Sequence, residues 1–123
     1  MSLVDASDVV DDYDEQYHKD IQDDYRFMVN HYLDNPKSIQ NINHRSPIYR
    51  RFVVEQFGER YAEEGVDFID ERFVAVLNNA PDHSLVHEIL RECKRQGDGS
   101  TDFLDKLSEI DKELLNNIVG YFL

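Results

Sequence analysis

Residues 46–65 of the sequence, SPIYRRFVVEQFGERYAEEG, carry the clearest helix signal in the chain. The stretch opens on serine and proline, a capping residue followed by the residue that best fits the first turn of a helix. At its end, Gly65 can adopt the left-handed conformation that closes many helices. Apolar residues cover much of the circumference, which predicts a central helix from Pro47 to about Glu64. Gly58 within this helix can allow a neighbouring helix to cross closely.

Toward the N-terminus, a second helix precedes this central one. Apolar and aromatic residues recur at three- and four-residue steps from about Asp8 or Asp11 to Leu33. Pro36 ends the helix, because the residue before a proline resists helical backbone angles. Residues 37–45, between the two helices, are predicted to form a loop.

Toward the C-terminus, the same periodicity predicts three further helices. The first runs from a cap at Asp67 to about Asn79, where a proline-containing breaker follows. Asp82 or Ser84 caps the next helix, which ends near Gly97. The last helix runs from the following turn to the end of the chain.

These elements predict an all-α fold, a compact bundle or orthogonal array of about five helices. Short β-branched runs fall within the helical periodicity, so no strand is expected. The 123 residues fit a single helical domain over residues 1–123, and the sequence leaves open whether residues 1–10 are disordered.

The single cysteine and the absence of targeting segments suggest where the chain resides. Cys93 cannot form an intramolecular disulfide, which fits a reducing compartment, and its place on an apolar helix face predicts a small buried residue. The sequence shows neither a signal peptide nor an apolar window long enough to cross a bilayer. A cytoplasmic location is therefore expected.

The net charge of −13 sets the most informative limit on function. Nucleic acids and anionic membranes are bound through clustered Lys and Arg, so this charge argues against both as the main partner. It is compatible with a basic protein partner, or with acidity that only keeps the protein soluble or suits a salt-rich host. The charge is uneven: residues 1–34 hold ten acids and two bases, whereas residues 35–54 hold four bases and no acids.

One pair of histidines has the spacing of metal ligands. His83 and His87 stand four residues apart on one helix, so both imidazoles can reach one ion. A zinc site needs at least a third protein ligand, which the sequence does not place. A small helical metal-binding protein or enzyme that uses these two histidines is therefore an alternative hypothesis, and no cofactor is predicted. Phosphate-binding loops, nucleophile elbows and Cys-x-x-Cys motifs are absent from the sequence.

The main hypothesis is a non-catalytic interaction module that binds a basic protein partner. Tyrosines are enriched at protein interfaces because they are large, stiff and amphipathic, and carboxylates attract basic partners. The predicted surface lies on the first helix and combines both residue types: Asp11, Asp12, Tyr13, Asp14, Tyr17, Asp20, Asp23 and Tyr25.

Small size, acidity and helical content together resemble bacterial immunity proteins, antitoxins and other inhibitors of basic enzymes. The resemblance is one of composition alone, and it implies an inhibitory or antitoxin-like binder. A further alternative is a homo-oligomeric structural subunit, such as a homodimer. For that alternative the apolar C-terminus, residues 118–123, is the feature to follow, because it can end in the core or in a neighbouring chain.

Overall fold

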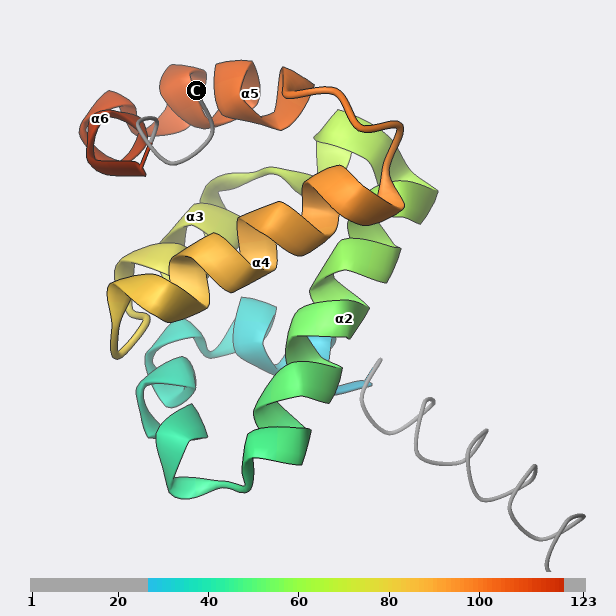
Figure 1. The fold of residues 1–123 in the computed structure, drawn as a ribbon. Coiled ribbons are helices and arrows are strands. Elements are labelled where there is room, and N and C mark those ends of the chain that lie inside the picture. The colour runs from blue at the N-terminus through green and yellow to red at the C-terminus, as the bar shows by residue number, and fades with distance from the viewer. Residues whose placement is uncertain (1–26, 119–123) are drawn as a thin grey trace, which may run out of the picture.

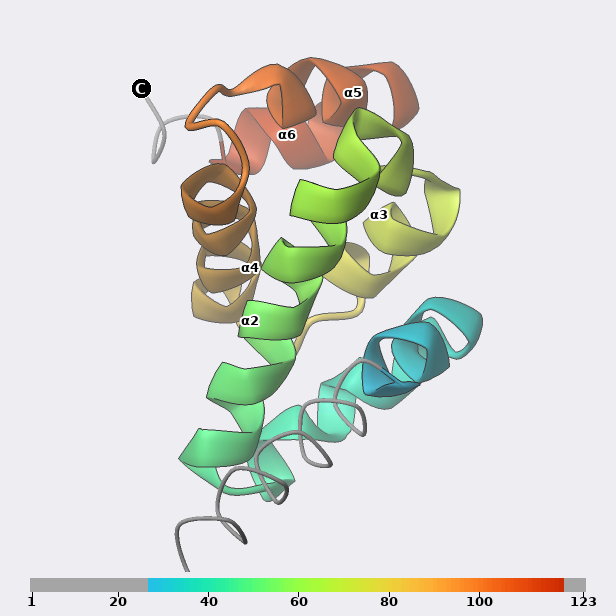
Figure 2. The same ribbon diagram turned by 90° about the vertical axis from the view of Figure 1, so that its right-hand side faces the viewer.

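The computed structural model describes residues 27–118, which fold into a compact array of helices (Figures 1 and 2). No strand occurs among these residues, so the predicted all-α class is confirmed. The helical elements number seven rather than about five, in addition to the helical residues 27–34. They are the 3-10 helices η1 (Pro36–His44) and η2 (Gly65–Phe68), and the α-helices α2 (Pro47–Glu64), α3 (Glu71–Asn78), α4 (His83–Gln96), α5 (Asp102–Ile110) and α6 (Lys112–Ile118).

Helices α2 and α4 form the centre of the fold, side by side and running in the same direction (Figures 1 and 2). The two helices approach closely at Gly58, where an added Cβ would lie 2.7 Å from Cγ of Glu92 and 3.0 Å from its backbone oxygen. The Gln96 amide also donates to the backbone oxygen of Glu55 at 2.9 Å. The predicted role of Gly58 as a crossing point is therefore confirmed.

A single apolar core joins α2 and α4 to the other elements. Phe57 of α2 contacts Phe73 of α3, with ring centroids 5.9 Å apart, and Phe68 of η2 completes the cluster. Tyr61 meets Phe103 of α5 edge to face at 5.9 Å. Burying aromatic side chains supplies much of the stabilising free energy of a domain this small.

Two predicted caps are present. Ser46 accepts a hydrogen bond from the Tyr49 amide at 3.1 Å and so caps α2. Asp82, rather than Ser84, caps α4 by accepting from the Leu85 amide at 2.8 Å. Both oxygens satisfy amides that would otherwise have no partner at a helix start.

Two boundary predictions are wrong. Residues predicted as a loop form the 3-10 helix η1, because Ile39 and Ile42 stand three apart and both reach the core. The predicted cap at Asp67 is also wrong, since α3 begins after Asp70, whose carboxylate accepts from the Phe73 amide at 3.0 Å. Asp67 instead lies within η2.

The last predicted helix is broken in two at Asp111. The carboxylate of Asp111 accepts from the Leu114 amide at 3.0 Å and from the Asn78 side chain at 3.0 Å. The Leu114 amide, followed by Asn78, lowers the pKa of Asp111. A capping aspartate thus starts α6 and bends the chain back over the core.

Candidate functional site

The acidic and tyrosine residues predicted as the partner surface, Asp11 to Tyr25, lie outside the described residues. That surface stays a prediction. The apolar C-terminus is described only at its first residue, Ile118, which is buried in the core of this chain. The homodimer alternative likewise stays a prediction.

The histidine pair gains no further ligand in the described part of the chain. Within residues 27–118, no group of three or more His, Cys, Asp or Glu side chains could hold a metal ion. His83 is exposed, while burial and the neighbouring His83 lower the pKa of His87. The third ligand that a metal site needs is therefore missing among these residues.

Cys93 is fully buried on α4. Burial raises the pKa of its thiol, so the thiolate that nucleophilic chemistry requires is disfavoured. The prediction of a small buried residue is confirmed.

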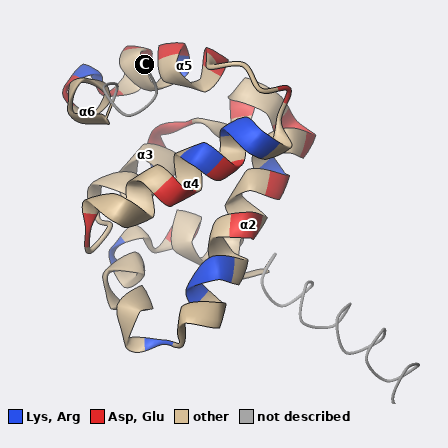
Figure 3. Ribbon diagram, in the orientation of Figure 1, with Lys and Arg blue, Asp and Glu red and all other residues tan. Residues whose placement is uncertain are grey.

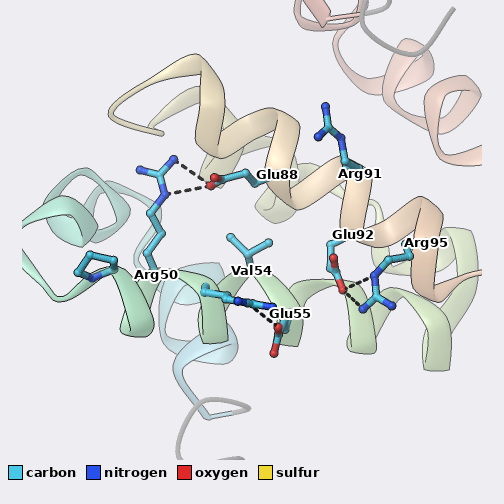
Figure 4. Close-up of a pocket in the computed structure, with 9 residues that line it drawn as sticks. Arg50, Val54, Glu55, Glu88, Arg91, Glu92 and Arg95 are labelled. Atoms are coloured by element: carbon cyan, nitrogen blue, oxygen red, sulfur yellow. Dashed lines mark hydrogen bonds and ion pairs between the residues drawn. The ribbon is translucent and has the colours of Figure 1, made fainter.

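A groove of about 660 Å³ lies between the N-terminal part of α2 and α4 (Figure 4). We call it the arginine groove, since charged side chains make up most of its lining. Its lining residues are Pro47, Arg50, Arg51, Val54, Glu55, Glu88, Arg91, Glu92 and Arg95.

Arg50 is held in place by several hydrogen bonds, and its side chain is only 18% exposed. The guanidinium donates to both carboxylate oxygens of Asp82 at 3.1 Å, to Ser84 at 2.9 Å and to Glu88 at 3.0 Å. Asn43 of η1 donates to the same Asp82 carboxylate at 2.8 Å. Arg50 holds the pKa of Asp82 well below its usual range, so this bidentate pair stays charged at neutral pH.

The other arginines of the groove are held less firmly. Arg51 pairs with Glu55 one turn along α2 at 3.2 Å but is 82% exposed, and Arg95 pairs with Glu92 on α4. The exposed Arg51–Glu55 pair contributes little to stability, whereas Glu92 is only 16% exposed and accepts from both Nε and Nη2 of Arg95. Arg91 has no hydrogen bond or ion pair within residues 27–118, and no dashed line leads from it in Figure 4.

A second opening, of about 440 Å³, lies at the other end of the same helix pair. We call it the acidic cleft, because two aspartates line it and, among the described residues, no Lys or Arg does. Its lining residues are Tyr61, Ala62, Gly65, Val66, Gln96, Gly97, Asp98, Ser100 and Asp102.

The two aspartates of the acidic cleft come from the turn after α4 and from the first turn of α5. Asp98 accepts from the Ser100 amide at 2.9 Å, and Ser100 lowers the pKa of its carboxyl. Asp102 stands in the first turn of α5, where the helix dipole favours a negative charge. Burial, followed by electrostatic interactions with Cys93, Asp98 and Asp102, raises the pKa of Tyr61, so its hydroxyl stays protonated.

The charges of α2 run against its helix dipole. The first turn of α2 holds no acid and its last turn holds no base. Arg50 and Arg51 come just after the positive N-terminal turn, while Glu63 and Glu64 close the negative C-terminal end. In Figure 3, acidic ribbon gathers at the end of α2, in the following loops and on α5, and basic ribbon marks the start of α2. Each end of α2 therefore has a stronger potential than its side chains alone would give.

Sequence reasoning missed both openings. The sequence places Arg50 and Arg51 near the start of the central helix, whereas Arg91 and Arg95 reach the same groove from α4. Asp98 lies in the predicted turn and Asp102 at the start of the last predicted helix, and neither position indicates a cleft. The charges at the two ends of α2, bases near its start and acids at its end, are the reverse of what the helix dipole favours, and this signal is visible in the sequence.

Comparison of the chain with protein-family models, with curated proteins and with solved structures gives no match. None of the helices in the described residues has the length and apolar character needed to cross a membrane.

Proposed function

We propose that this chain is a non-catalytic interaction module that binds a basic protein partner and receives a Lys or Arg side chain of that partner in the acidic cleft. The main support for this proposal is the cleft itself. Asp98 and Asp102 line an opening of about 440 Å³, and none of its described lining residues is a Lys or Arg. An inhibitor, immunity protein or antitoxin-like binder would use such a surface against a basic target.

The potential of the cleft supports a cationic ligand. The C-terminal ends of α2 and α4 both reach this opening, through Gly65 and Gly97. Carbonyl groups at helix ends carry partial negative charge, which adds to the charge of the two carboxylates. Such a field steers a basic partner during encounter and makes association sensitive to salt.

The apolar part of the cleft supports a long basic side chain rather than a bare cation. Val66 is 39% exposed beside the cleft, and Ala62 is exposed next to it. The methylene stem of a Lys or Arg can lie against these side chains while its charged end reaches the carboxylates. The acidic and tyrosine residues between Asp11 and Tyr25 enter the same proposal as a second surface.

The first experiment is affinity capture from the host's lysate at about 50 mM and about 500 mM salt, followed by binding measurements on the captured protein. The test variant is Asp98→Asn with Asp102→Asn, which removes two charges while asparagine can still accept the Ser100 hydrogen bond. The matched control is Glu109→Gln with Glu113→Gln, which removes two exposed charges from α5 and α6 outside the cleft.

We expect a basic partner whose dissociation constant rises about tenfold or more in the cleft variant and changes little in the control. Equal weakening in both variants would show that only total charge matters and that the cleft is the wrong surface. Capture of no basic protein at either salt concentration would contradict the function as proposed.

A further inference from the structure

We propose that the arginine groove binds a small molecule carrying a multiply charged oxyanion, of the pyrophosphate class. This site is distinct from the acidic cleft and does not rest on the function proposed above. Four of the cations in residues 27–118 line this one opening, and they come from two helices that face each other across it (Figure 4).

The mobile charges of the groove are the ones that suit a ligand. Arg91 is exposed and makes no hydrogen bond or ion pair with another described residue. Its guanidinium points away from α2 in Figure 4, and exposed side chains change rotamer within nanoseconds, so it can turn over the opening that it lines. Arg51 is 82% exposed and can exchange its weak intrahelical partner for a phosphoryl oxygen, while Arg95 is 67% exposed and can donate through the N–H groups that its pair with Glu92 leaves over.

The start of α2 adds a fixed positive potential to the groove. Pro47, the first residue of this 18-residue helix, is one of the lining residues. Amide groups at a helix start carry partial positive charge, and no acid in the first turn of α2 neutralises it. Three to four guanidinium groups beside a helix start match the charge and the oxygen-rich surface of a pyrophosphate group.

The same groove argues against a long polyanion as its ligand. Glu55, Glu88 and Glu92 lie among the arginines, and the chain as a whole carries a net charge of −13. A nucleic acid would place many phosphates beside these and other acidic residues, whereas a small anion is short enough to contact the guanidinium groups without extending over the rest of the acidic surface. The groove volume of about 660 Å³ falls in the range of small-molecule sites.

The test is isothermal titration calorimetry of the full chain with inorganic pyrophosphate at low ionic strength. Chloride salt is added so that the protein and ligand solutions have the same ionic strength. We expect a dissociation constant of about 0.1–1 mM for the wild type. Arg91→Gln should weaken binding about tenfold, because it removes one charge-assisted interaction and leaves the fixed Arg50 network in place. NMR shifts induced by pyrophosphate should gather on residues 47–55 and 88–95 and spare α5 and α6.

The matched control is Arg72→Gln, which removes one exposed arginine that pairs with Asp34 and Asp70 outside the groove. This variant should bind pyrophosphate as the wild type does. Two results would overturn the proposal. The first is equal weakening of pyrophosphate binding by Arg72→Gln. The second is no binding by the wild type at about 10 mM pyrophosphate, about tenfold above the expected dissociation constant. Self-association of the wild type that Arg91→Gln abolishes would also overturn it, and would assign the groove to a second copy of this chain.

Discussion

Helices α2 and α4 lie side by side and run in the same direction, yet their charges follow opposite rules. Helix α4 follows the dipole: Asp82 caps its start, and Lys94 and Arg95 occupy its last turn. Helix α2 opposes the dipole at both ends. The Arg50–Asp82 pair joins the two starts, so α4 neutralises part of the charge of α2 at that end.

At the other end of the pair, no ion pair joins α2 to α4 among the described residues. Arg95 is paired within α4 to Glu92, and Lys94 does not line the acidic cleft. This difference separates charges that stabilise the packing of the fold from charges that are available to bind a partner. Charges that cross between elements, as at Arg50, organise the packing, whereas charges that oppose their own helix dipole cost some stability and are expected where a surface serves binding.

The largest expected effect comes from breaking the crossing on which both openings depend. Gly58→Leu should lower the free energy of unfolding by about 3 kcal/mol, because the added atoms meet the Glu92 backbone oxygen as well as two side chains. Denaturant unfolding checks this value. Gly58→Ala provides a test of sign: a helix open to solvent gains about 1 kcal/mol from this change, whereas a close crossing loses stability. A more stable Gly58→Ala variant would contradict the crossing.

The next effect comes from removing the carboxylate that joins the two helix starts. Asp82→Ala should cost about 2 kcal/mol, since it removes the α4 cap and the bidentate partner of Arg50. The cost is limited because Asp82 is 36% exposed and Arg50 keeps Glu88. Asp82→Asn keeps a good cap and loses only the charge, so we expect about half that cost. No cost in Asp82→Asn would show that the ion pair contributes nothing beyond the cap, and equal costs in the two variants would show that the cap contributes nothing beyond the ion pair.

The same pair predicts a pH dependence. The folded-state pKa of Asp82 lies below its unfolded value of about 4, so its stabilisation is complete above that pH. The stabilisation is lost as the pH falls from there through the folded-state pKa. The difference in unfolding free energy between wild type and Asp82→Asn should therefore be constant near neutral pH and should shrink below pH 4 or so. A difference that persists unchanged into strong acid would exclude the charge as its source.

The fold could be predicted from the sequence where apolar period and capping residue agreed. Pro47 to Glu64 shows both signals, and its boundaries match. The break at Asp111 was missed because Leu107, Ile110 and Leu114 keep helical spacing across it, and the apolar pattern cannot show that the chain turns there. The 3-10 helix η1 was missed because two buried isoleucines three apart are too few to stand out from a loop.

The two openings depend on tertiary structure and were less predictable. Arg50 and Glu88, or Tyr61 and Gly97, come together only because α2 and α4 run in the same direction. Local patterns do not fix that direction, since the chain between them passes through η2 and α3. The reversed charges of α2 were visible in the sequence, although their meaning depended on knowing what faces each end.

The smallest effect on stability should be the sharpest test of the comparison. Ala62→Lys places a base in the last turn of α2, on the rim of the acidic cleft. This change corrects the helix dipole, so we expect stability to be unchanged or to rise by about 0.5 kcal/mol in denaturant unfolding. The same change should weaken a basic partner, because the new ammonium group occupies the cleft and repels the incoming side chain.

The control for this variant is Ala62→Gln, which adds a side chain of similar length without charge. If the potential at the end of α2 serves binding, the lysine variant alone should keep or gain stability while it loses affinity for the partner. Equal losses of affinity in both variants would mean that the cleft is blocked by bulk and that its charge is incidental. A lysine variant that loses stability would show that the C-terminal end of α2 is already neutralised, and the contrast between α2 and α4 would then carry no functional meaning.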